Sequence, residues 1–426
     1  MASRLIWRRS ATAAGLYLST FLGILGTVVA ARVLGLEEFG LYATVLAAAG
    51  FFQALLDLTV EESLTKYGFR YATAGDWGRL RRLFRRALEL KLAGGALAGL
   101  ALLALAPVAD AVFNADGLAV PLAVAAALPL LQAPENVAGT ALLLRGRYDV
   151  RGALQTFSMA LRLAAIAVGV RYGVTETIVA VAAAQVVATA AVGAVGLAAF
   201  RRFPDAPPLP LGDDRGGIVS FVLRSSASTG LLSLRNAVAP LLLGMVTGPV
   251  QVGLFRIAQA PQTGFLAASS PVRLILLTDQ TRAWERGDAG RVLRGVRAYS
   301  LTAAAIGAVA VPVFWVAMPH LVELVFGARY LPATDAARVI LLAAVLQLVV
   351  GWSKSLPTTI GRPGLRLATH GIETAVLLPL VVVLGARDGV TGAAVALLVS
   401  SAVYLVCWAV LYSRLVRAPS PAVSSP

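Results

Sequence analysis

Charged residues, cysteine and histidine are all scarce in this chain of 426 residues. Only 14% of the residues are charged, against about 25% in a typical soluble domain, and 58% are hydrophobic. The single cysteine, Cys407, excludes an intramolecular disulfide and a thiolate metal site. Two histidines offer few acid–base or metal-binding arrangements, and no glycine-rich phosphate loop with Lys and Ser or Thr is present. The composition indicates a polytopic membrane protein without a cofactor, and it disfavours an enzyme or an ATP-driven pump.

Acidic residues are also few, and this imbalance has a simple explanation in a membrane protein. The 37 Lys and Arg residues outnumber the 22 Asp and Glu residues, which gives a net charge of +15. In a soluble protein such an excess would indicate nucleic-acid binding. In a chain this apolar it indicates cytoplasmic loops, where basic residues concentrate. We therefore expect no nucleic-acid partner.

Apolar runs of about 20 residues, the length that crosses a bilayer, recur along the chain. We predict twelve spans, centred near residues 21, 49, 99, 130, 163, 188, 231, 263, 310, 346, 376 and 402. With the N-terminus inside, the inner loops hold 28 of the 37 basic residues, the outer loops five and the spans four. This bias predicts a multi-pass protein of a bacterial or archaeal cytoplasmic membrane, with both termini in the cytoplasm.

Four short motifs occur twice, in the same order and displaced by 212 to 216 residues. They begin at Gly35 and Gly248, at Gly75 and Gly287, at Pro107 and Pro319, and at Gly173 and Gly389. The repeats predict an N-terminal six-helix lobe (1–205), a cytoplasmic linker (206–217), a C-terminal six-helix lobe (218–417) and a disordered tail (418–426). Because six is even, both lobes enter from the same side, which favours a central cavity between them.

The first long inner loop is predicted to form a basic amphipathic helix. Trp77, Leu80, Phe84 and Leu88 share one face, and arginines surround it. Such a helix anchors a protein at the membrane surface, and it could also steer an anionic lipid substrate.

Positive charge inside the spans is costly and so points to a function. Arg162 lies in mid-span, Arg224, Ser228 and Arg235 share one face of the seventh span, and Arg256 begins the eighth. One interpretation is that these side chains pair with acids or reach an interface. The other is that they line a hydrated cavity, where planar guanidinium donors suit phosphate oxygens. We take all five residues as candidates for substrate binding.

Acidic groups and amides within the spans are the second set of candidates. Asp57, Glu135, Glu373 and His370 are candidates for ion coupling, although structural pairing explains them equally well. Five glutamines in spans could bind sugars or water, or join neighbouring helices; they are Gln132, Gln185, Gln259, Gln262 and Gln347.

The run AARVLGLEEFGLYATVLAAAGFFQALLDLTVEESLTKYGFRY carries a family resemblance. Its motifs are Leu34-Gly35, Phe39-Gly40-Leu41-Tyr42 and Asp57-Leu58, and related ones occur at 248–255, 330–333 and 389–394. The chain resembles polysaccharide and O-antigen flippases of the multidrug/oligosaccharidyl-lipid/polysaccharide exporter superfamily. Some relatives have fourteen spans instead of twelve. Asn236 stands where many carry an acidic residue, which argues against cation coupling there.

The resemblance implies an alternating-access flippase in lipopolysaccharide or other cell-surface polysaccharide biosynthesis. It would move a polyprenyl-diphosphate-linked oligosaccharide from the cytoplasmic to the outer leaflet, with Arg162, Arg224, Arg235 and Arg256 as candidates to engage the diphosphate. Its partners would be the bilayer, the lipid-linked oligosaccharide, a glycan polymerase and glycosyltransferases. Three alternatives stay open: a multidrug or metabolite cation antiporter of the same fold, an integral-membrane glycan polymerase or ligase, and a scaffold without transport activity.

Overall fold

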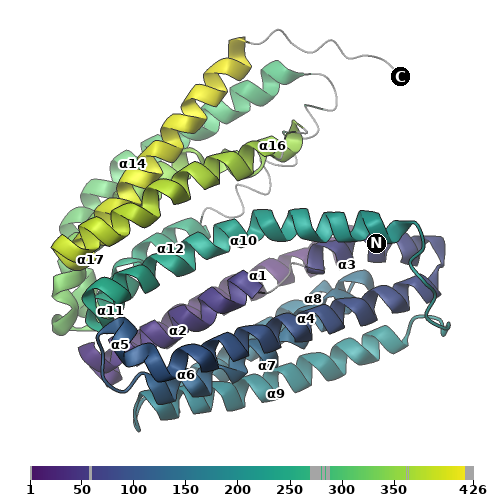
Figure 1. The fold of residues 1–426 in the computed structure, drawn as a ribbon. Helices are drawn as coiled ribbons and strands as arrows, with labels where there is room; N and C mark the ends of the chain where they lie inside the picture. The colour runs from purple at the N-terminus through teal and green to yellow at the C-terminus, as the bar shows by residue number, and fades with distance from the viewer. Residues whose placement is uncertain are drawn as a thin grey trace. The chain divides into compact units, whose positions relative to one another are not determined.

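The computed structural model describes residues 2–56, 60–268, 280, 284, 288–360, 362 and 364–417, and these residues are helical apart from turns and short connections (Figure 1). The chain divides into two compact units, Met1–Leu241 and Leu242–Pro426. The division falls within one helix, just after Pro240. The lobe boundaries that we infer from the repeats stay a prediction, and the tail 418–426 lies outside the described residues.

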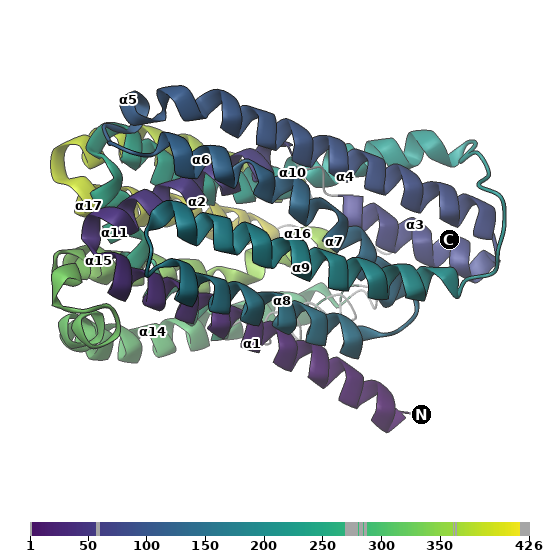
Figure 2. The same cartoon turned by 90° about the horizontal axis from the view of Figure 1, so that it is seen from below.

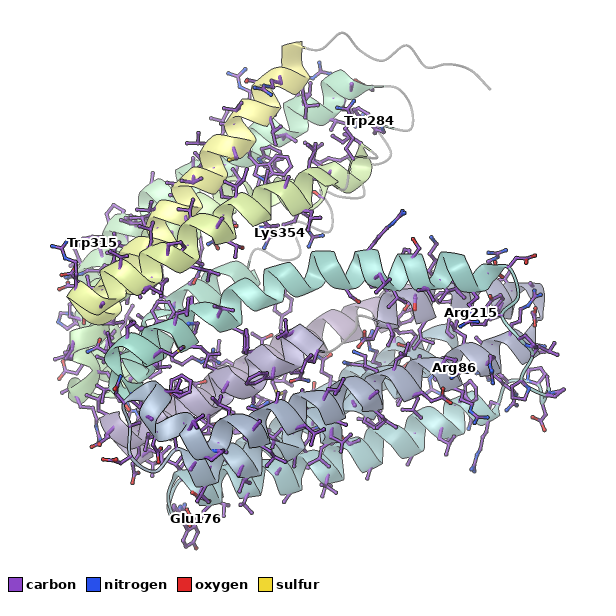
Figure 3. All side chains as sticks on the ribbon, in the orientation of Figure 1. Arg86, Glu176, Arg215, Trp284, Trp315 and Lys354 are labelled. Atoms are coloured by element: carbon purple, nitrogen blue, oxygen red, sulfur yellow. The ribbon has the colours of Figure 1, made fainter. Side chains whose placement is uncertain are left out.

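The first unit is a bundle of long helices joined by short turns. Its elements are α1 (Ala2–Leu34), α2 (Leu36–Leu56), α3 (Val60–Ala74), α4 (Trp77–Leu105), η1 (Ala106–Val108), α5 (Ala109–Phe113), α6 (Ala119–Ala125), α7 (Ala127–Leu144), α8 (Tyr148–Gly169), α9 (Val174–Arg201) and most of α10 (Asp214–Thr247). The helix α8 packs between α1 and α9, while α7 packs against α9 and α4 (Figure 2). Arg86 and Arg215 lie at one end of this bundle and Glu176 at the other (Figure 3).

The second unit centres on α15, which packs against α17, α14, α12 and α11. Its elements are the end of α10, α11 (Pro249–Ala258), α12 (Ala260–Ala268), α14 (Ala289–Phe326), η2 (Ala328–Ala333), α15 (Thr334–Val349), η3 (Gly351–Lys354), α16 (Leu356–Thr359) and α17 (Gly364–Arg417). α17 is in fact two helices that meet at Gly389, where φ is 58° and ψ is −133°.

Every predicted span centre lies in a helix, which confirms an all-α polytopic fold. Among the described residues, eight helical segments are long and apolar enough to cross a membrane. Because α17 contains two predicted spans, these segments account for nine of the twelve. The span predicted near residue 130 lies on α7, which is not among these segments. The spans predicted near residues 231 and 263 lie on α10 and α12, where part of the chain is outside the described residues.

The internal repeat is visible in how equivalent helices begin. The Asp76 carboxylate accepts a hydrogen bond from the backbone N–H of Arg79 at 3.0 Å and so caps α4. The Asp288 carboxylate accepts one from the backbone N–H of Arg291 at 2.7 Å and caps α14. An aspartate that bonds the third residue of a helix satisfies an amide that would otherwise lack a partner. The same cap at the same repeat position supports two structurally equivalent helical sets.

Left-handed backbone recurs at equivalent turns as well. Gly35 and Gly248, which precede α2 and α11, have φ of 86° and 83°. Gly173 and Gly389 have φ of 128° and 58°. A side chain at such φ values is strained, so glycine is required at these turns. The repeated glycines therefore mark repeated changes of chain direction.

The segment that joins the two helical sets is bound to the first unit. Phe203 is buried and stacks on Trp77, with ring centroids 5.6 Å apart. Arg81 forms an ion pair with Asp205 at 2.8 Å. The apolar face predicted for the surface helix at the start of α4 is thus covered by protein in part: Leu80 and Phe84 lie in the same buried cluster as Phe203, whereas Leu88 is exposed.

The first turn of α10 is fixed to α3 by a buried hydrogen bond. The Tyr71 hydroxyl donates to Oδ2 of Asp214 at 2.9 Å, and Arg70 pairs with Oδ1 at 3.1 Å. Tyr71 is only 3% exposed. Burial, together with the hydrogen bond to the Asp214 carboxylate, raises the pKa of Tyr71 to about 12. Tyr71 therefore stays a neutral donor at physiological pH.

Candidate functional site

The first unit contains a polar network among otherwise apolar helices. Glu135 on α7 accepts hydrogen bonds from the Ser158 hydroxyl on α8 and from Nε2 of Gln185 on α9, both at 2.9 Å. No basic group in the described part of the chain forms an ion pair with this carboxyl. Glu135 therefore joins three helices through neutral donors, which agrees with structural pairing. Its role in ion coupling stays a prediction.

Side-chain amides extend this network into a ladder across three helices. In the first unit, Gln53 on α2 donates to Gln132 on α7 at 3.0 Å, and Gln132 donates to Gln185 at 3.4 Å. We call these three residues the amide ladder. Buried amides in a membrane span need such partners because lipid offers none.

The second unit has a similar polar ladder, in which a serine replaces one of the three amides. Gln262 on α12 donates to Gln347 on α15 at 3.2 Å, and Gln347 donates to Ser401 on α17 at 3.0 Å. Gln347 lies 215 residues after Gln132, close to the spacing of the sequence repeat. The ladder is therefore part of the repeated framework.

A buried ion pair lies beside the first ladder, and our sequence analysis missed it. Nζ of Lys91 on α4 is 2.6 Å from Oε1 of Glu61 on α3, and the Lys91 side chain is 2% exposed. A small pocket, partly open to solvent, is bordered by Lys91 together with Gln53, Gly94, Gly95, Ala98, Pro129, Gln132, Ala133 and Asn136. The sequence feature that could have indicated this pair is a single lysine in the apolar run ALELKLAGGALAG.

The structure places the candidate arginines on three helices. Arg162 is half-buried on α8, one turn after Ser158, and it makes no ion pair or hydrogen bond with the described residues. Arg224 is exposed on α10 and Arg256 is exposed on α11, in the second unit. The side chains of Ser228 and Arg235 lie outside the described residues. Their convergence on one cavity stays a prediction.

The second unit buries a titratable cluster. Nδ1 of His370 is 3.0 Å from Oε2 of Glu373, and the two side chains are 5% and 0% exposed. The His370 ring stacks on Tyr404 with centroids 4.8 Å apart, and the Tyr404 hydroxyl lies 2.8 Å from the Ser353 hydroxyl. This geometry fits structural pairing, and it also provides groups that can exchange a proton. Asp57, the fourth residue proposed for ion coupling, lies outside the described residues.

Comparison with known proteins identifies the family. Residues 9–266 match the family model described as polysaccharide biosynthesis protein. The chain belongs to this polysaccharide biosynthesis protein family. A segment of 130 residues is 37% identical to the inner membrane protein YghQ of Escherichia coli (strain K12), a match that spans 28% of this chain and 33% of YghQ.

Solved structures of transporters share the fold of this family member. An inward-facing multidrug resistance MATE family transporter of the MOP superfamily is 15% identical, with a TM-score of 0.71, over 95% of this chain and 96% of the other. The lipid II flippase MurJ in its inward closed conformation is 11% identical, with a TM-score of 0.70, over 95% and 89%. At these identities the likeness shows the fold, and the fold is that of membrane transporters and flippases. The expected polytopic all-α fold is confirmed.

Proposed function

We propose that this chain is a flippase that moves a polyprenyl-diphosphate-linked oligosaccharide from the cytoplasmic to the outer leaflet for cell-surface polysaccharide biosynthesis. Membership of the polysaccharide biosynthesis protein family supports the pathway. A fold shared with a lipid II flippase supports the kind of substrate, a glycan on a lipid carrier. The sugar would cross between the two helical sets as they alternate in access, while the polyprenyl tail stays in lipid.

The proposal rests on the position of Arg162 within the helix α8. It lies fourteen residues after the start of α8 at Tyr148, about 21 Å along a helix that rises 1.5 Å per residue. A charge at that depth is expensive, and no described carboxylate pairs with it. A guanidinium offers five donors in a planar fork that matches phosphate oxygens. We infer that Arg162 contributes to binding the diphosphate.

A leaflet-accessibility assay in proteoliposomes tests this role. Loss of one charge-assisted hydrogen bond costs about 1.5–3 kcal/mol, so we expect Arg162→Ala to slow flipping about tenfold or more. Arg162→Lys keeps the charge without the fork and should fall between Arg162→Ala and wild type. Arg171→Ala removes an exposed arginine from the turn after the same helix and should flip at the wild-type rate.

Unchanged flipping in Arg162→Ala combined with Arg235→Ala would remove the diphosphate-binding role from these arginines.

One observation favours the alternative of a cation antiporter: the Glu135 carboxyl has neutral donors around it and no ion-pair partner in the described residues. Efflux of a cationic dye by the same proteoliposomes, abolished by Glu135→Gln, would favour that alternative over the flippase.

A further inference from the structure

The ion pair between Lys91 and Glu61 is deep in the first unit. Lys91 follows the first residue of α4, Trp77, by fourteen residues, which is about 21 Å along the helix. The ammonium is almost fully buried, and only 26% of the Glu61 side chain is exposed. Moving an ammonium out of water costs several kcal/mol unless it is paired. The Arg151 guanidinium also interacts electrostatically with Glu61, but Lys91 is the residue that forms the ion pair at 2.6 Å.

The residues around Lys91 are of the types that a hard cation prefers. Glu61 contacts Lys91 with its carboxylate, and the pocket that Lys91 borders is also bordered by Gln53, Gln132 and Asn136, whose side chains carry amide oxygens. Carboxylate and carbonyl oxygens are the usual ligands of hard cations in proteins, including sodium in transporters. The pocket has room for about one water molecule and no sugar, so an ion suits it better than a glycan does.

We propose that the Lys91 ammonium is a built-in counterion, held where a mobile monovalent cation would otherwise neutralise Glu61. With Lys91 in place, the first unit needs no exchangeable cation at this pocket. Removing the ammonium while keeping the carboxylate should convert the pocket into a sodium site, because truncation to alanine also opens space beside the amides. This inference does not depend on which substrate the protein carries.

The test is the thermal unfolding of the purified full-length chain in detergent at constant ionic strength, with NaCl replaced stepwise by N-methylglucamine chloride. Wild type should show one melting temperature throughout. Lys91→Ala should melt several degrees lower in N-methylglucamine, and NaCl should restore part of the loss in a saturable way, since an ion that binds only the folded state stabilises it. Lys91→Arg should stay independent of sodium.

The matched control is Lys91→Ala combined with Glu61→Gln, which removes both charges and should lose the sodium response. An equal sodium response in the single and double variants, or no response in either, would overturn the proposal. If Lys91→Ala yields folded protein only when purified in NaCl, the proposal stands. If it fails in both salts while the double variant folds in both, sodium does not replace the ammonium and the proposal fails. None of these outcomes bears on flipping.

Discussion

Replacing His370 with leucine should strongly destabilise the second unit, because the substitution leaves the fully buried Glu373 carboxyl without the imidazole that contacts it at 3.0 Å. Leaving a buried polar group without its hydrogen-bond partner typically costs about 1–3 kcal/mol, whereas replacing both partners by apolar groups of similar shape can be nearly neutral. We therefore expect His370→Leu to lower the free energy of unfolding by about 1–3 kcal/mol. The double variant His370→Leu/Glu373→Met should stay within about 1.5 kcal/mol of wild type.

Denaturant unfolding in detergent, followed by tryptophan fluorescence, measures both values. Trp352 and Trp408, two of the six tryptophans, lie in the same buried cluster as Tyr404, which stacks on His370, so part of the signal comes from this region. His320→Leu is the control: this histidine is exposed on α14, and its loss should change stability by less than about 0.5 kcal/mol. A double variant as unstable as His370→Leu would refute the electrostatic reasoning. A double variant that is stable but inactive in transport would assign the pair to ion coupling.

Two further predictions concern the first unit. Asp214→Asn should lower the pKa of Tyr71 from about 12 toward the ordinary value of 10. It should not reach 10, because burial is the larger cause of the raised pKa. The pKa is measured by tyrosinate absorbance, with Tyr71→Phe as the reference. A pKa that is raised by folding contributes stability that is present below pH 10 and is lost as the pH rises through about 12. Between pH 10 and 12, Asp214→Asn should therefore lose less stability than wild type. Gly99→Ala places a Cβ 2.5 Å from the carbonyl oxygen of Ala126, so it should lower the free energy of unfolding by about 1–3 kcal/mol. The control Gly193→Ala has no atom within 4 Å of its Cβ and should raise that free energy by up to about 1 kcal/mol. Equal effects of the two substitutions in thermal unfolding would contradict the contact argument.

The sequence predicts the helices well where an apolar run is uninterrupted. The helices α1, α2 and α9 each follow one run of about 20 or more apolar residues, so length and hydropathy suffice to locate them. The spans near residues 130 and 263 are each divided, at Ala126 and at Gln259. Such breaks depend on tertiary contacts, as where Gly99 meets the Ala126 carbonyl, and hydropathy averaged over a window does not detect them.

The polar sites were predictable in residue type but not in partner. Gln132, Gln185 and Gln347 stood out as amides in apolar spans, and each has a hydrogen-bond partner on another helix. The pair of Lys91 and Glu61 was not predictable from local pattern, because it requires α3 to fold back along α4. A pairing between residues thirty positions apart leaves no periodic trace in the sequence.

The two helical sets repeat the hydrogen-bonded framework but not the ionic groups. In the register set by the caps Asp76 and Asp288, Lys91 corresponds to Ala303, which is also buried. In the register of Gly173 and Gly389, Glu373 corresponds to Phe157. A ladder of hydrogen-bonded polar side chains occurs in both sets, which indicates that it belongs to the fold itself. The Lys91–Glu61 pair and the His370–Glu373 pair each occur in one set only, so the fold does not require them. Function that differs between the two halves should therefore be sought first at these two pairs.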